Sequence, residues 1–278
     1  MADAESAAAT SQRIALGVEY DGSAFNGWQA QLSPRLATVQ ESLEAAIAAI
    51  AAHPVRTVCA GRTDAGVHGS GQVVHFDTAA ERPLKAWVAG VNSILDRHCA
   101  VQWARAVPGE FHARFSALSR RYRYCIHNAR VRPALLASFV TSHHQPLDTA
   151  AMHAAGQYLL GEHDFSSYRG SACQSTTPMR NVMALSVQRQ GSYVVVDIEA
   201  NAFLLHMVRN IVGMLLVVGE GRRPPDWAGE LLQLRDRTRA PATAPPNGLC
   251  LCQVRYPERY GLPGAADYFL PGLQAPLS

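Results

Sequence analysis

The chain has 278 residues and a mass of 30.1 kDa, which suits two domains or one large domain. Its hydrophobic content of 48% is enough for a sizeable core and excludes a fibrous or globally disordered protein. The net charge of +3 is too small to identify a partner. However, 24 of the 25 basic residues are arginine, and Lys85 is the single lysine. Either a GC-rich genome or a need for guanidinium groups at phosphates would produce this bias, so the placement of the arginines must decide.

The first half of the chain predicts a mixture of strands and helices. Residues 13–20 alternate in polarity as a half-buried strand does. Thr38 followed three residues later by Glu41 is typical of a helix start, and apolar residues at helical spacing follow it. Pro108-Gly109 is the best candidate for a joint between two halves. The other expected elements are strands at 57–60 and 72–76, a helix at 84–95 and a strand at 101–107.

The second half repeats this mixture. Gln190-Gly191 between two apolar runs predicts a hairpin. Segregated helices and hairpins indicate an α+β fold with two α/β halves and a mainly antiparallel sheet. We expect a flexible leader at 1–12, halves at 13–108 and 109–257, and a loosely held tail at 258–278. The expected elements are an extended stretch at 115–128, strands at 182–189, 193–199 and 249–256, helices at 148–160 and 202–218, and a short helix before 235–239.

Cysteine usage and the termini indicate the compartment. None of the six cysteines forms a Cys-x-x-Cys motif, and a chain this long needs no disulfides, so we expect reduced thiols. The leader has no basic start and therefore does not resemble a signal peptide. The longest apolar run, 211–218, is far shorter than a membrane span. The sequence predicts a cytoplasmic protein without membrane contact.

A glycine-rich loop is the first candidate site. Residues 60–71 contain four glycines together with Arg62, Asp64 and His68. The loop is either a polar turn, in which Asp64 caps its own backbone, or a place where the backbone approaches a ligand. A Walker-type phosphate loop is excluded because no Gly-Lys-Ser/Thr follows. A metal site of Asp64, His68 and His75 would lack any familiar ligand spacing.

An arginine-rich stretch is the second candidate. Residues 111–133 contain six arginines and no acid. A strand here would place Arg121 and Arg123 on one face and Tyr122 and Tyr124 on the other. The stretch is either a solvated charged strand or a cationic surface beside stacking rings, as nucleic-acid binding requires. We favour the second, because six arginines without an acid repel one another. The predicted RNA contacts are Arg114, Arg120, Arg121 and Arg123.

A polar stripe on an apolar helix is the third candidate. Residues 201–213 are apolar except for Asn201 at the start and His206, Arg209 and Asn210, and the latter three share one face at helical spacing. A buried arginine needs an anion, because its charge is costly to remove from water. The partner of Arg209 is either an ordinary acid of the core or Asp64 in the glycine-rich loop.

At these residues the sequence resembles the TruA family of tRNA pseudouridine synthases. The resemblance covers residues 13–257 and rests on Tyr-Asp-Gly-x-x-Phe-x-Gly-Trp-Gln at 20–29, Gly-Arg-Thr-Asp-Ala-Gly-Val-His at 61–68, Arg-Arg-Tyr-Arg-Tyr at 120–124 and the stretch 201–213. It implies two α/β halves around a central basic cleft. It also implies a homodimer that uses no cofactor or metal and converts uridine to pseudouridine at positions 38–40 of the tRNA anticodon arm.

The resemblance also implies roles for four residues. Asp64 matches the catalytic aspartate, and Tyr122 matches a tyrosine that packs on the target base. Arg62 matches an arginine associated with the flipped-out nucleotide, and Arg209 matches the arginine that pairs with the aspartate. The carboxylate either attacks the ribose C1′, attacks the uracil ring or abstracts a proton, and the sequence leaves these alternatives open.

Two other functions compete with an isomerase. A noncatalytic RNA-binding protein would use the same arginines and tyrosines, although the intact Arg62–Asp64 loop favours catalysis. A metal-dependent hydrolase would use Asp64 and the nearby histidines, although no recognisable ligand motif supports it.

Overall fold

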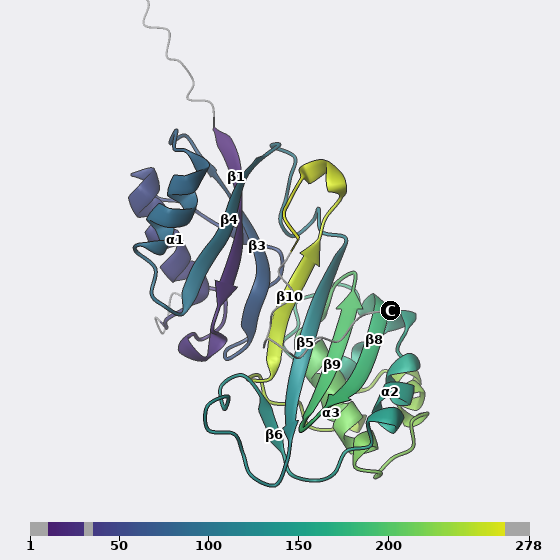
Figure 1. Cartoon of the computed structure of the whole chain (residues 1–278). Coiled ribbons are helices and arrows are strands. Elements are labelled where there is room, and N and C mark those ends of the chain that lie inside the picture. The colour runs from purple at the N-terminus through teal and green to yellow at the C-terminus, as the bar shows by residue number, and fades with distance from the viewer. Residues whose placement is uncertain (1–10, 31–35, 265–278) are drawn as a thin grey trace, which may run out of the picture.

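One continuous sheet forms the centre of the molecule. The computed structural model describes residues 11–30 and 36–264, and within them ten strands pair in the order β4-β1-β3-β10-β5-β9-β8-β7, with β2 beside β3 and β6 beside β5 (Figure 1). Only β10 with β3 and β5 with β6 are parallel, so the expected α+β fold with a mainly antiparallel sheet is confirmed. The strands are β1 (Gln12–Tyr20), β2 (Val58–Cys59), β3 (His68–Thr78), β4 (Cys99–Val107), β5 (Ser119–Asn128), β6 (Thr141–His143), β7 (Gly161–Asp164), β8 (Met179–Gln190), β9 (Tyr193–Ala200) and β10 (Leu249–Arg255).

Helix α1 (Val39–Ala51) covers the N-terminal part of the sheet. The Thr38 hydroxyl accepts a hydrogen bond from the backbone N–H of Glu41, so the predicted start of this helix is confirmed. Leu43 belongs to one buried cluster with Leu16 of β1 and Phe76 of β3. The expected helix at 84–95 is present but contains a wider turn, a π-helical segment at Ala86–Gly90.

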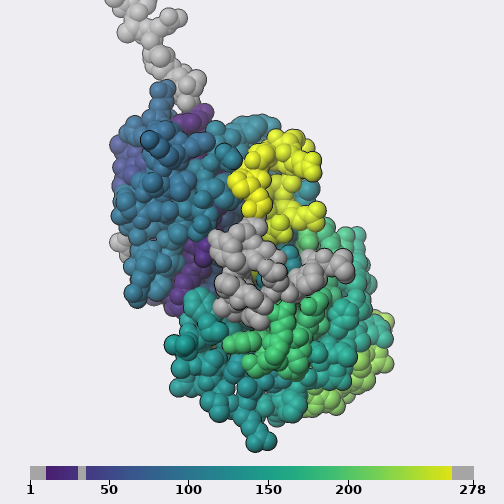
Figure 2. All heavy atoms as spheres, viewed as in Figure 1, coloured from purple at the N-terminus to yellow at the C-terminus, as the bar shows by residue number. Residues whose placement is uncertain are grey.

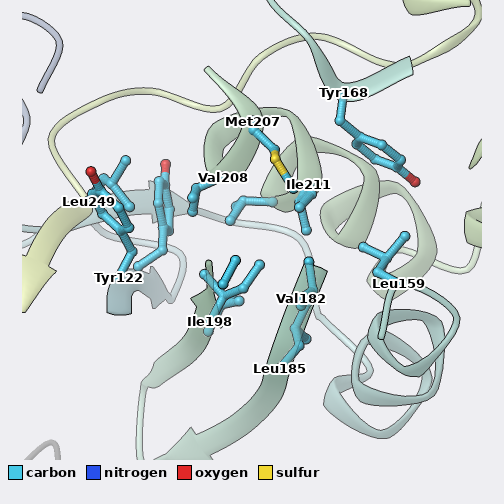
Figure 3. Close-up of a cluster of buried hydrophobic side chains, with 14 of the residues drawn as sticks. Tyr122, Leu159, Tyr168, Val182, Leu185, Ile198, Met207, Val208, Ile211 and Leu249 are labelled. Carbon is cyan, nitrogen blue, oxygen red and sulfur yellow. The ribbon is translucent and has the colours of Figure 1, made fainter. Parts of the chain in front are cut away.

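Helices α2 (Thr149–Gln157), α3 (Met207–Gly219) and α4 (Trp227–Leu234) belong to the C-terminal part. Ile211 of α3 shares a buried cluster with Ile198 of β9 and Val182 of β8, and Figure 3 shows these side chains facing one another. Tyr122 lies at one end of this cluster, near Leu249 and Val208. No helix of the described residues is long and apolar enough to span a membrane.

The prediction of a helix from residue 202 is wrong for its first turn. Helix α3 begins at Met207, and His206 has a left-handed backbone with φ +61°. Tertiary contacts explain the difference: the Leu205 carbonyl accepts from Gly170 N–H, and Leu205 N–H donates to the Cys173 sulfur. Leu205 therefore bonds to the 170–173 segment at both its N–H and its carbonyl, and residues 202–206 do not form a helical turn.

Helices α1 and α3 cover opposite faces of the sheet. Val74 and Phe76 of β3 belong to the core under α1, whereas Val73 belongs to the core under α3. Because successive side chains of a strand point to opposite faces, α1 and α3 lie on different sides of β3. The hairpin predicted at Gln190-Gly191 is present between β8 and β9, and the extended stretch expected from 115 becomes a strand only at Ser119.

Strand β10 joins the N-terminal and C-terminal parts of the sheet. It is the last strand in the chain, yet it lies between β3 and β5, with Leu251 opposite Gly69 on one side and Tyr122 on the other (Figure 1). In Figure 2 the yellow C-terminal segment lies against the blue N-terminal part. The sheet thus runs without interruption through the expected halves 13–108 and 109–257. Residues 1–10 of the expected leader and 265–278 of the expected tail lie outside the described ranges.

Candidate active site

A cavity of about 750 Å³ lies where the glycine-rich loop, β5 and the start of α3 meet. Of the described residues that line it, Asp64 is the only acid. Five arginines line it as well, so the cavity carries an excess of positive charge: Arg62, Arg114, Arg120, Arg180 and Arg209.

The loop that carries Asp64 is held by the motif at residues 20–29. The Trp28 N–H donates to the Thr63 carbonyl at 3.0 Å, and the Tyr20 and Thr63 hydroxyls lie 2.9 Å apart. Gly27 has φ +88°, and a Cβ there would lie 2.9 Å from the Thr63 carbonyl oxygen. The loop closes on itself through a 3.1 Å bond from Val67 N–H to the Asp64 carbonyl. These contacts fix the backbone of Asp64 from both sides.

The Asp64 carboxylate contacts two cationic or ionisable side chains. Its Oδ2 accepts from Arg209 Nη1 at 3.1 Å and lies 3.4 Å from His206 Nε2. Arg209 is itself held by a 2.8 Å bond from its Nε–H to the Ala244 carbonyl. The predicted pair of Arg209 with Asp64 is therefore confirmed, and the alternative of an unrelated core acid is wrong.

His206 was not predicted to contact Asp64. The sequence placed it on the polar stripe of a helix, but its left-handed backbone directs it from the turn before α3 instead. It lines the cavity and is about one-third exposed. Its proximity in sequence to Arg209 was the only signal available.

Tyr122 forms an aromatic wall of the cavity. It is 8% exposed, and its ring meets Phe203 edge to face with centroids 5.1 Å apart. Burial, together with the nearby negative charge of Asp64, raises the pKa of Tyr122 well above its usual value, so the phenol stays neutral. Phe203 was missed because the sequence assigned it to a helix, with no sign that it turned toward Tyr122.

The four arginines of 111–133 that were predicted to contact RNA fall into two groups. Arg114 and Arg120 line the cavity. Arg121 and Arg123 point to the opposite face of β5 from Tyr122, and both pair with Asp197 of β9, at 2.7 Å and 3.1 Å. The expectation that these two lack an acidic partner is wrong, because Asp197 lies directly across from Arg123 in the neighbouring strand. Arg123 is only 1% exposed, and neither side chain lines the cavity.

The histidines of the alternative metal site are occupied elsewhere. His68 contacts Gly22 N–H, the Ser138 carbonyl and Asp21. His75 accepts from Ala113 N–H at 3.1 Å. In residues 11–30 and 36–264 no group of three or more His, Cys, Asp or Glu side chains is arranged to hold a metal ion.

Comparison with known proteins adds to this geometry. A sequence profile described as tRNA pseudouridine synthase matches residues 17–116 and 155–257. The chain is 58% identical to tRNA pseudouridine synthase A of Vibrio cholerae serotype O1, over 90% of this chain and 94% of the relative. It is also 58% identical to the protein of the same name from Escherichia coli O1:K1 / APEC, over 90% of this chain and 92% of that protein.

A solved Cbf5-Nop10-Gar1 complex is a distant structural match, with a TM-score of 0.34 and 13% identity over 73% of this chain and 45% of that chain. The profile match and the two high identities establish the relationship. The chain belongs to the tRNA pseudouridine synthase A family of isomerases.

Proposed function

We propose that the enzyme converts uridine to pseudouridine at positions 38–40 in the anticodon stem-loop of tRNA, with Asp64 as the catalytic nucleophile. One observation supports this most directly: the single acid among the described residues of an arginine-lined cavity is aimed by Arg209 and lies beside the Tyr122 ring. Family membership supports the reaction, and the site geometry supports the choice of nucleophile.

The chemistry matches what these residues can supply. The reaction breaks the bond between uracil N1 and ribose C1′, turns the base and forms a bond from C5 to C1′. The C5 proton leaves and N1 gains a proton, so no net oxidation occurs and no cofactor is required. A carboxylate can begin this rearrangement as a nucleophile. Arg209 directs the Asp64 carboxylate through the 3.1 Å charge-assisted hydrogen bond from its Nη1 to Oδ2.

The target base must leave its helical stem to reach Asp64. A cavity of about 750 Å³ is large enough to receive a nucleotide. Tyr122 and Phe203 offer ring surfaces for the base, and the exposed Arg62 and Arg114 offer charge to the opened strand. These side chains support the central basic cleft of the proposal. The homodimer implied by the family resemblance and the cytoplasmic location predicted from the sequence are part of it as well.

The test is to map the product on single-target tRNAs. Three tRNA transcripts each carry uridine at only one of positions 38, 39 and 40, and a fourth has uridine at none of them. We expect pseudouridine at each target position in the first three, detected by carbodiimide modification and primer extension, and none in that arm of the fourth. Modification confined to another arm would contradict the proposed site. Each reaction is run with and without chelator, and activity only in its absence would favour the metal-dependent alternative.

A further inference from the structure

Two buried arginines of the cavity have no acid to neutralise them. Arg120 and Arg180 line the cavity, and each is only 8% exposed. Within the described parts of the chain neither forms an ion pair. Asp64, the one acid among the described residues of the cavity lining, is bound by Arg209. A buried charge is costly unless an opposite charge lies close to it.

The contacts of Arg180 hold its position but leave its charge uncompensated. Its Nη1 donates to the Thr177 carbonyl at 3.0 Å and to the Met179 carbonyl, and its Nη2 donates to the Ser175 hydroxyl at 2.7 Å. Its Nε is buried and has no hydrogen-bond partner. All of these acceptors are neutral. The guanidinium is therefore fixed in place before any ligand arrives.

Arg120 is held in the same way. It donates to the backbone carbonyls of Ala60 at 3.0 Å, of Asn201 at 2.8 Å and of Arg114. The bond to the Arg114 carbonyl brings a third cation of the cavity lining close to it. Burial lowers the pKa of both Arg120 and Arg180, and the nearby charge of Arg114 lowers it further in each case. Arg114 thus repels both buried arginines on this side of the cavity.

We propose that Arg180, together with Arg114 and with the charge of Arg120 close by, binds a backbone phosphate of the RNA next to the flipped-out nucleotide. This inference rests on the proposed function and adds a residue, Arg180, that lies outside the arginine-rich stretch. A phosphodiester supplies the missing negative charge, and guanidinium groups match its geometry. Arg180 acts as a positioning residue: it places the target nucleotide with its base toward Asp64 and takes no part in the bond changes.

The experiment combines protein variants with single neutral linkages in the RNA. The variants are Arg180→Gln, Arg180→Lys and the control Arg189→Gln, which changes an exposed arginine of the same strand that lies outside the cavity lining. The substrate is a tRNA assembled with one methylphosphonate in place of one phosphate near the target uridine. For each combination of protein and tRNA, we would measure equilibrium binding as a function of salt and the single-turnover rate at saturating enzyme.

We expect Arg180→Gln to raise the Kd about 10-fold and Arg189→Gln to leave it unchanged, because hydrogen bonds to charged groups are the stronger ones. In Arg180→Gln the plot of log K against log salt should be less steep than in the wild type by about 0.7 to 0.9, the value for one lost phosphate contact. Wild-type enzyme should lose at least as much affinity from one neutral linkage beside the target, and Arg180→Gln should lose less from that linkage than the wild type does, because its own contact to the phosphate is already gone. Arg180→Lys should keep part of this coupling.

The phosphate assignment would be overturned if, for both Arg180 variants, the loss of affinity from the protein change and the loss from the neutral linkage added together at every linkage tested. If Arg180→Gln does not fold, Arg180→Lys and the linkage scan of the wild-type enzyme give the same decision, and a scan without a sensitive linkage beside the target would overturn it. Failure of the proposed function is distinct from either result: the wild-type enzyme would form no pseudouridine on the all-phosphate tRNA.

Discussion

Asp64 owes its position to residues far from it in the sequence. Arg209, 145 positions later, donates to its Oδ2, while Tyr20 and Trp28 hold the neighbouring Thr63. Only the first of these contacts could be predicted, because a buried arginine demands an anion and the glycine-rich loop offered one. Of the supporting bonds to Thr63, the one from Trp28 joins backbone groups and the one to Tyr20 joins two hydroxyls, and neither follows from a local sequence pattern.

The pair of Asp64 with Arg209 should govern the rate of reaction. We expect Arg209→Gln to lower the single-turnover rate about 100-fold, because a misdirected nucleophile loses its alignment with the target. Arg209→Lys should recover part of the rate, since it keeps the charge. An unchanged rate in Arg209→Gln, with wild-type far-ultraviolet circular dichroism, would show that Asp64 needs no such partner.

His75 should make the fold sensitive to acid. Burial, with the charges of Arg13 and His112, lowers the pKa of His75 from 6.5 to about 4. The neutral ring therefore stabilises the fold above pH 6.5, and this contribution is lost as the pH falls through 4.

The matched variant is His75→Gln, which keeps an acceptor for the Ala113 N–H. Between pH 6.5 and 4 the wild type should lose about 1 to 2 kcal/mol more unfolding free energy than this variant. Urea unfolding across this range measures the difference. Parallel losses in both proteins would mean that His75 does not titrate in this way.

Arg121 and Arg123 show where residue patterns fail. Their alternation with Tyr122 and Tyr124 correctly predicted two different faces of one strand. However, their partner Asp197 comes from β9, and the register between β5 and β9 decides that pairing. A local stretch without acids therefore does not imply an unpaired cationic surface. Arg120 and Arg180, the two buried cavity arginines that form no ion pair within the described residues, belong to different strands, and no motif grouped them.

At the scale of elements, local signals predicted ends and turns well. The Thr38–Glu41 cap and the Gln190-Gly191 hairpin depend on neighbouring residues and are present in the structure. The start of α3 was misplaced because Leu205 bonds to Gly170 and Cys173, a tertiary contact that overrides helical periodicity. That same irregular turn brings His206 and Phe203 to the cavity.

The close approach of β3 and β10 requires a glycine. A Cβ at Gly71 would lie 2.0 Å from the Cys252 carbonyl oxygen, and this neighbour is backbone that cannot move aside. We expect Gly71→Ala to lower the free energy of unfolding by about 3 kcal/mol or more. Gly109→Ala, where nothing lies within 4 Å of the added carbon, should change it by less than about 0.5 kcal/mol. Equal denaturation midpoints for the two variants would refute this account of the contact between the strands.

At the scale of the whole molecule, a single sheet brings the site together. The first half supplies Asp64, β5 supplies Tyr122, and α3 supplies Arg209. Strand β10 lies between β3 and β5 and holds these parts in register. The sequence predicted the fold class and most elements, but it assigned the last strand to the C-terminal half alone. Strand order is set by long-range pairing, which periodicity does not encode.

The most direct test of the central claim is tritium release from tRNA labelled at uracil C5, because forming pseudouridine removes that hydrogen. Wild-type enzyme is compared with Asp64→Asn and with Asp226→Asn, which changes an exposed aspartate at the start of α4. We expect the wild type and Asp226→Asn to release tritium at the same rate. Asp64→Asn should still bind tRNA, but it should release tritium at less than about one-thousandth of that rate. Release by folded Asp64→Asn at the wild-type rate would contradict the assignment of Asp64 as the nucleophile.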